Sequence, residues 1–129
     1  MKVENNLSKL DKIAEPIYEK KKINFPNENT TLYVKSKNWG LTGNHKNTVI
    51  STNPDLEFQA DSVTEYVFQG FSEIIYKTDN DTLKIYSHYE PSIPSKFDSK
   101  IKVEFIKIRN NVEWNELKGK IENYYQIFE

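Results

Sequence analysis

Apolar residues recur at every second position through much of the chain between residues 31 and 108, and this period restricts the fold to one rich in β-strands. In the clearest example, 82–89, Leu83 and Ile85 alternate with polar side chains. Alternation places successive side chains on opposite faces of a strand, so that one face is apolar and the other polar. We therefore expect an antiparallel sheet with at least one solvated face.

Turn residues divide the alternating region into separate strands. The predicted strands lie at 31–37, 48–52, 62–69, 73–77, 82–89 and 100–108. The turn signal Asp79-Asn80-Asp81 predicts a hairpin between the fourth and fifth of them. The apolar phase reverses at Phe105-Ile106, which indicates either a bulge or a strand end that is covered on both faces.

The two ends of the chain have a helical period instead. Residues 6–15 have the apolar stripe of an amphipathic helix, which Pro16 would end or kink, leaving the charged run 19–22 as a solvated helix end. After the candidate N-cap at Asn110-Asn111, a second apolar stripe is formed by Trp114, Leu117, Ile121 and Tyr124, and continues to Ile127 or Phe128.

These elements predict an α+β fold, in which an antiparallel sheet of about six strands is flanked by an N-terminal and a C-terminal helix. A small β-sandwich or barrel with helices packed on it is the alternative. We see no linker or internal repeat, so a single domain is expected to span residues 1–129.

Charge excludes several classes of partner. The chain has 18 basic and 19 acidic residues, which gives a net charge of -1, and Arg109 is its single arginine. Proteins that bind nucleic acids or anionic membranes usually have a basic surface, and arginine is the residue suited to bidentate binding of phosphate. We expect no nucleic-acid partner, and the absence of a run of about 18 apolar residues predicts no transmembrane segment. A protein or a small ligand is the expected partner, and the oligomeric state is left open.

The compartment depends on the N-terminus. The chain has no cysteine, and residues 1–6 lack the apolar core of a signal peptide. As written, the protein is expected in the cytoplasm. If a native signal peptide has been removed, it is extracytoplasmic, and a lipoprotein domain is then one alternative function.

Histidine is the side chain best suited to proton transfer near neutral pH, and the chain has two, His45 and His88. Neither belongs to a local catalytic signature such as His-Glu-x-x-His. No catalytic residue, metal ligand or cofactor is therefore assigned. A small hydrolase or isomerase is kept as an alternative, and it requires the two imidazoles, or one of them and an acid, to converge in a pocket.

Aromatic residues are the one surplus, at 13% of the chain with eight tyrosines. Other apolar residues already supply a core, so some of the rings should face outward, where tyrosine and tryptophan favour interfaces. Aromatic cross-strand pairing without any partner is the competing explanation. The side chains predicted to contact a partner or ligand, on a sheet face and in the 39–45 loop, are Tyr33, Trp39, His45, Tyr86 and His88.

The leading functional hypothesis is a small, non-enzymatic binding or interaction protein. Small bacterial accessory proteins, including toxin-neutralising immunity proteins, have this size and composition, and the analogy suggests a bacterial source.

Overall fold

The computed structural model describes residues 15–71, 73–121 and 126–128. The helix predicted at 6–15 lies outside the described residues except for Glu15, which is a bend. In chain order the elements are β1 (Ile17–Phe25), the 3-10 helix η1 (Pro26–Glu28), β2 (Thr30–Trp39), β3 (His45–Ser51), β4 (Tyr66–Gln69), β5 (Ile74–Asp79), β6 (Thr82–Ser87), β7 (Lys102–Lys107), α2 (Asn111–Lys118) and β8 (Gln126–Phe128).

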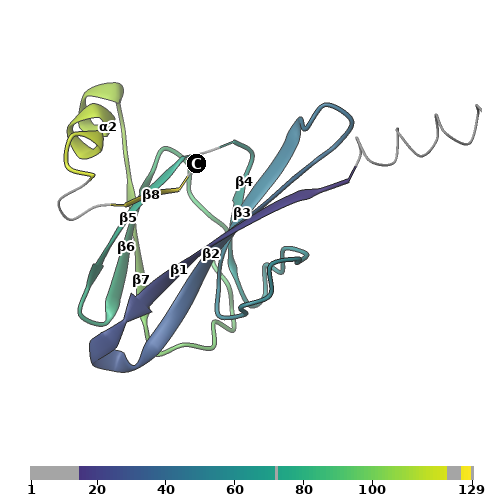
Figure 1. Cartoon of the computed structure of the whole chain (residues 1–129). Helices are drawn as coiled ribbons and strands as arrows, with labels where there is room; N and C mark the ends of the chain where they lie inside the picture. Colours follow the sequence, from purple (N-terminus) through teal and green to yellow (C-terminus); the bar gives the residue numbers. More distant parts are fainter. Residues whose placement is uncertain (1–14, 72, 122–125, 129) are drawn as a thin grey trace, which may run out of the picture.

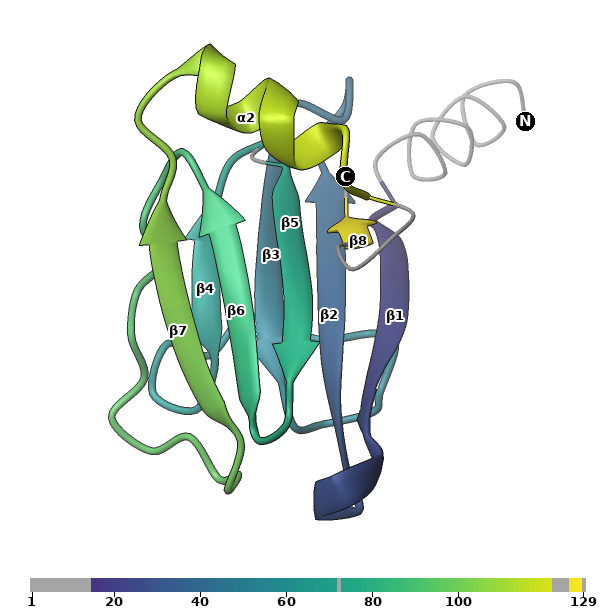
Figure 2. The same cartoon turned by 90° about the vertical axis from the view of Figure 1, so that its left-hand side faces the viewer.

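The described strands form two four-stranded sheets that face each other (Figures 1 and 2). Sheet A has the order β1-β2-β3-β4, and its neighbouring strands are all antiparallel. Sheet B has the order β7-β6-β5-β8, and its β6-β7 pair is parallel. Helix α2 lies across one end of sheet B (Figure 2).

The prediction of one antiparallel sheet flanked by two helices is wrong. The strands divide between two layers, and α2 is the one α-helix among the described residues. The layers are those of a sandwich, which the sequence analysis gave only as the alternative. Each sheet has an apolar face that must be buried, and here the two sheets cover each other instead of packing against helices.

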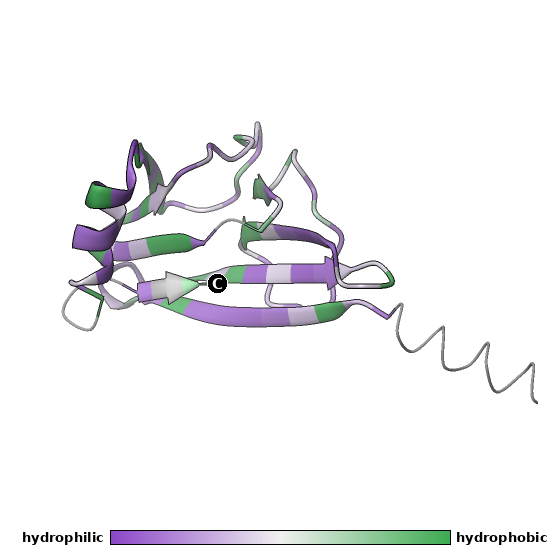
Figure 3. Cartoon of the chain, turned by 90° about the horizontal axis from the view of Figure 1, so that it is seen from above, coloured by the Kyte–Doolittle hydropathy of each residue, from purple (hydrophilic) through white to green (hydrophobic). Residues whose placement is uncertain are grey.

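The core lies between the sheets and draws on both of them. Its fully buried apolar side chains come from alternate positions of the strands, as in Leu32 and Val34 of β2 and Leu83 and Ile85 of β6. Figure 3, which views the layers from above, shows apolar and hydrophilic stretches alternating along the strands. Phe128 of β8 belongs to the same core, so the end of the described chain helps to close it.

The charged run 19–22 lies inside β1 and does not end a helix. β1 pairs with β2 from Ile17 to Phe25, and only Ile23 and Phe25 of this strand are buried. The other side of β1 is an edge of sheet A, where lysines are common because they discourage pairing with another chain. The charged side chains interrupt the apolar alternation of β1, and for this reason the segment was wrongly predicted as a helix end.

Most of the other strand predictions are confirmed. The hairpin between β5 and β6 turns at Asn80, which has the left-handed φ of 53°. The predicted strand 62–69 begins only at Tyr66, because the N–H groups of Thr64 and Glu65 donate to the carbonyl of Asp61 in a turn.

The C-terminal part of the chain differs from its prediction. Asn110 caps α2 as expected, since its Oδ1 accepts a hydrogen bond from the N–H of Glu113 at 3.0 Å. The helix ends at Lys118, however, and residues 126–128 form β8 instead of continuing the apolar stripe. The strand before the helix is covered on both faces at its end, because Phe105 faces the core while Ile108 packs with Trp114 beneath α2.

The long connection 88–101 is the crossover between the parallel strands β6 and β7. Parallel strands need a crossover that returns the chain to the end where the first strand began. This connection leaves the end of β6, forms a bridge between Ser92 and Val67 at the edge of sheet A, and enters β7 alongside the start of β6. It thereby ties the two sheets together.

Candidate functional site

The sequence placed Trp39 and His45 at either end of one loop, and the structure brings them together. They lie opposite each other at the ends of β2 and β3, and their rings stack at a centroid distance of 5.5 Å and an angle of 21°. The turn between them needs glycine at Gly40, where φ is 99° and a Cβ would come within 2.5 Å of Asn44 Oδ1. A tight turn that glycine makes possible therefore holds the ring pair at one end of sheet A.

Tyr33 shares this face, because odd-numbered residues of β2 point away from the core. Lysine ammonium groups lie over the rings: Lys20 is 5.6 Å from the centroid of Tyr33, and Lys37 is 5.5 Å from that of Trp39. Such distances are within the range of cation–π attraction. We call this surface the aromatic–lysine face, and it consists of Tyr18, Lys20, Tyr33, Lys37, Trp39 and His45.

The β3–β4 connection covers the neighbouring part of the same face. Lys35 of β2 is fully buried beneath it; its Nζ donates to the carbonyl of Asp55 at 2.9 Å and lies 4.8 Å from the ring centroid of Phe58. Burial lowers the pKa of Lys35; the charges of Glu65 and Asp55 oppose this and that of Lys20 adds to it. Lys35 holds the connection on the sheet and is itself out of reach of a partner.

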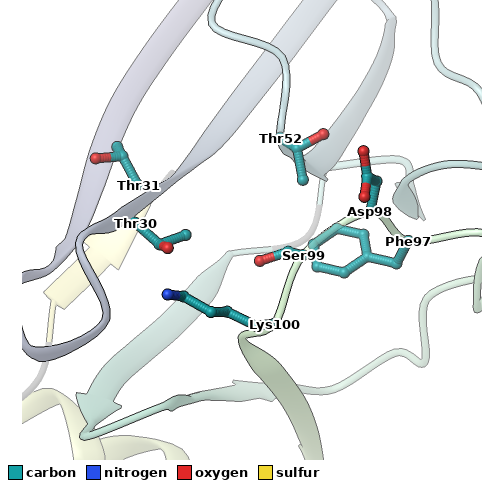
Figure 4. A pocket seen from close by; sticks show the side chains of 7 residues that line it. All are labelled: Thr30, Thr31, Thr52, Phe97, Asp98, Ser99 and Lys100. Carbon is teal, nitrogen blue, oxygen red and sulfur yellow. The ribbon is translucent and has the colours of Figure 1, made fainter.

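Two hollows lie beside this connection and share Thr52 and Asp98. One of about 420 Å³ reaches Lys35 and Glu65, and the other, of about 530 Å³, lies between the start of β2 and residues 97–100 (Figure 4). Figure 4 shows Lys100 extending toward Thr30.

Several polar groups of the larger hollow already have partners. The Thr30 hydroxyl donates to the Glu28 carbonyl at 2.9 Å, and Lys100 forms an ion pair with Glu28 at 3.7 Å. The Thr31 hydroxyl donates to Asn24 Oδ1 at 3.1 Å. These hollows are therefore weaker candidates than the aromatic–lysine face.

Of the remaining two predicted residues, Tyr86 lies in β6 of sheet B and His88 directly follows the end of that strand. Tyr86 packs against the cluster of Ile75, Ile108 and Trp114 that α2 covers, and the ring of His88 lies 4.9 Å from that of Trp114. The five predicted residues thus divide into two groups: Tyr33, Trp39 and His45 share one face, whereas Tyr86 and His88 do not belong to it.

The ring of His45 stacks on that of Trp39, whereas the ring of His88 is tilted by 46° against that of Trp114. The hydrolase or isomerase alternative stays a prediction. Within the described ranges, no three histidine, aspartate or glutamate side chains gather as metal ligands. Nor does any helix there have the length and apolar character that crossing a membrane requires.

Neither the lysines of the face nor the rings around His88 are among the site residues predicted from the sequence. Lys20 was placed at a helix end, so its position over Tyr33 could not be expected. The odd-residue parity of β2 would have grouped Lys37 with Tyr33 and Trp39. Nothing local connects Phe71, Tyr89 and Trp114, which come from three separate segments and line one pocket with His88.

The chain matches no protein-family model, no curated protein and no solved structure.

Proposed function

We propose that the protein is a non-enzymatic binding domain and that its aromatic–lysine face receives a partner protein. The observation that carries this proposal is the set of half-exposed rings with ammonium groups held over them. Tyr33 and Trp39 belong to neither hydrophobic cluster, so the sandwich does not need them for its core.

The chemistry of the face favours an acidic protein surface as its partner. The rings offer apolar contact area with little side-chain entropy to lose, while the lysines supply positive charge on a chain of net charge -1. Lys22, which is exposed on the same side of β1, adds to that charge. The face is also part of a sheet surface and not a cavity, which suits a macromolecule better than a small ligand.

Site-specific photocrosslinking tests this proposal. A photoreactive phenylalanine at position 33 reports on the aromatic–lysine face, and the same residue at position 104 reports on the exposed outer side of sheet B. We expect a protein adduct from position 33 alone, and Lys37→Glu should reduce its yield several-fold because it replaces one positive charge of the face with a negative one. The matched control Lys102→Glu changes an exposed lysine of sheet B and should leave the yield unchanged.

Two results would contradict the proposal. Equal adducts from positions 33 and 104 would show contact without a preferred face. Loss of the adduct after nuclease treatment would identify nucleic acid as the bound molecule, which aromatic and basic side chains together can also hold. Circular dichroism of each variant checks that the fold is retained.

A further inference from the structure

A second pocket, at the end of sheet B covered by α2, has a chemistry of its own. It has a volume of about 260 Å³ and is built where Phe71, Glu73, the end of β6 and the first turn of α2 meet. The hydroxyl of the buried Ser87 joins two of these segments, since it lies 3.4 Å from the carbonyl of Glu73 and 3.5 Å from the N–H of Tyr89. The pocket is therefore framed by the fold and not by loops alone.

Its walls are aromatic. Phe71 and Tyr89 are 58% and 68% exposed, so neither ring is used to build the core. Trp114 supplies a further wall, with His88 packed against it at 4.9 Å. Ring faces carry a negative quadrupole and attract cations, most strongly when the cation can shed its water.

The pocket also contains the carboxylate of Glu73, which can balance the charge of a cation. Glu73 Oε2 is buried and accepts no hydrogen bond of acceptable geometry from the described residues. The ammonium group of Lys118 comes within 3.3 Å of it and lies 6.0 Å from the centroid of Trp114. Lys118 thus balances the charge of Glu73 in an ion pair whose two side chains are 40% and 39% exposed, so the ammonium group, on its flexible stem, can be displaced.

We propose that this pocket binds a quaternary ammonium group, with Phe71, Tyr89 and Trp114 contacting its methyl groups and Glu73 balancing its charge. In the unbound protein the ammonium group of Lys118 lies over Trp114 and that of Lys46 lies 5.9 Å from the ring centroid of Phe71, and the ligand displaces both. A methylated ammonium fits better than a bare one, because one carboxylate cannot replace the hydrogen bonds that a bare ammonium makes to water. None of the residues that line the pocket belongs to the aromatic–lysine face, so this proposal does not depend on that face.

Choline and its neutral isostere 3,3-dimethylbutan-1-ol provide the direct test, because the two differ in charge and not in shape. We expect choline to bind about 10-fold more tightly than the isostere. Binding should shift the NMR signal of the Trp114 indole N–H. Acetylated trimethyllysine amide, compared with choline, tells whether the ammonium comes from a modified protein side chain or a free molecule, and a preference for either supports the site.

Variants assign the binding to the pocket. Glu73→Gln and Tyr89→Leu should each weaken choline binding several-fold, and Lys118→Met should strengthen it, since the competing ammonium is removed. Lys120→Met, which lies outside the pocket, is the matched control and should have no effect. Equal binding of choline and the isostere would overturn the proposal. So would the absence of an indole shift with both ammonium ligands in the native protein and in Lys118→Met.

Discussion

Two buried titratable side chains, Lys35 and Tyr76, act on the stability of the sandwich in opposite directions as the pH becomes alkaline. Lys35 is buried as an ammonium, which is the form that burial disfavours, whereas Tyr76 is buried as a neutral phenol, which is the form that burial favours. Single substitutions separate the two effects.

Lys35→Met should raise the free energy of unfolding relative to the native protein most at neutral pH. The folded-state pKa of Lys35 is lowered while the unfolded value is near 10.5, so the unfolded state binds more protons between these values. The free energy of unfolding of the native protein therefore rises relative to that of the methionine variant as the pH rises toward 10.5, and the difference between the two becomes smaller. Urea unfolding of both proteins across this range measures the convergence.

Lys35→Ala serves as the comparison, because it removes the charge and also leaves a cavity under Phe58. It should lower the free energy of unfolding by about 2–5 kcal/mol, as truncation of a long buried side chain does. If the methionine variant were as unstable as the alanine variant, the buried ammonium would be a net source of stability, contrary to this reasoning.

Tyr76→Phe tests the opposite sign. Tyr76 is 3% exposed, and burial raises its pKa from 10.0 to about 12, so the folded state holds its proton longer than the unfolded state. Its contribution is complete below pH 10 and is lost as the pH rises toward 12, by up to about 3 kcal/mol. The phenylalanine variant keeps the ring and should lack this loss. Unfolding curves that run parallel for the two proteins between pH 9 and pH 12 would contradict the prediction.

Helix α2 is held in place by one buried side chain and by the hydrogen bonds at its N-terminus. Its range, Asn111–Lys118, is short for a helix to persist by itself, and its buried side chain is that of Trp114. Two hydrogen bonds organise its start: Asn110 accepts from the N–H of Glu113, and Glu113 Oε2 accepts from the N–H of Arg109 at 3.0 Å.

Asn110→Ala should therefore lower the free energy of unfolding by about 1 kcal/mol, because the N–H of Glu113 loses its acceptor. Hydrogen exchange should quicken first at the amides of α2, before those of sheet B. Asn110→Asp, which keeps the acceptor, and Asn115→Ala, an exposed change in the same helix, are the matched controls. Equal loss of protection throughout sheet B would show that the cap acts on the whole fold instead.

Elements with a strong period could be predicted, and those without one could not. β2 and β6 alternate cleanly, so their faces follow from the sequence. β1 is interrupted by charges that suit an edge strand, and it resembled a helix end. β8 spans only residues 126–128, too few to establish any period, and the spacing of Ile121 after Trp114 and Leu117 extended the predicted helix over it.

At the scale of the whole molecule, alternation shows that a strand has an apolar face but not what covers it. The packing of sheet A on sheet B rests on contacts between residues far apart in sequence, such as Phe68 of β4 with Phe105 of β7, whose ring centroids lie 6.4 Å apart. The same holds for the candidate sites. The Trp39–His45 pair flanks one turn, so its proximity could be predicted from the sequence. The pocket around Trp114 is lined by segments far apart in the chain, so it could not be predicted without the fold.

The two sheets also differ in how their strands can find one another. In sheet A every strand pairs with its neighbour in the chain, and its longest connection, residues 52–65, is much shorter than the chain between β5 and β8. In sheet B, β7 pairs with β6 only after the 88–101 crossover. β8 pairs with β5, from which β6, β7 and α2 separate it in the sequence. Closing longer loops costs more chain entropy before any contact compensates for it. We therefore expect the β5–β8 pair to form late in folding, because it closes the longest stretch of chain of all the strand pairs in the described residues.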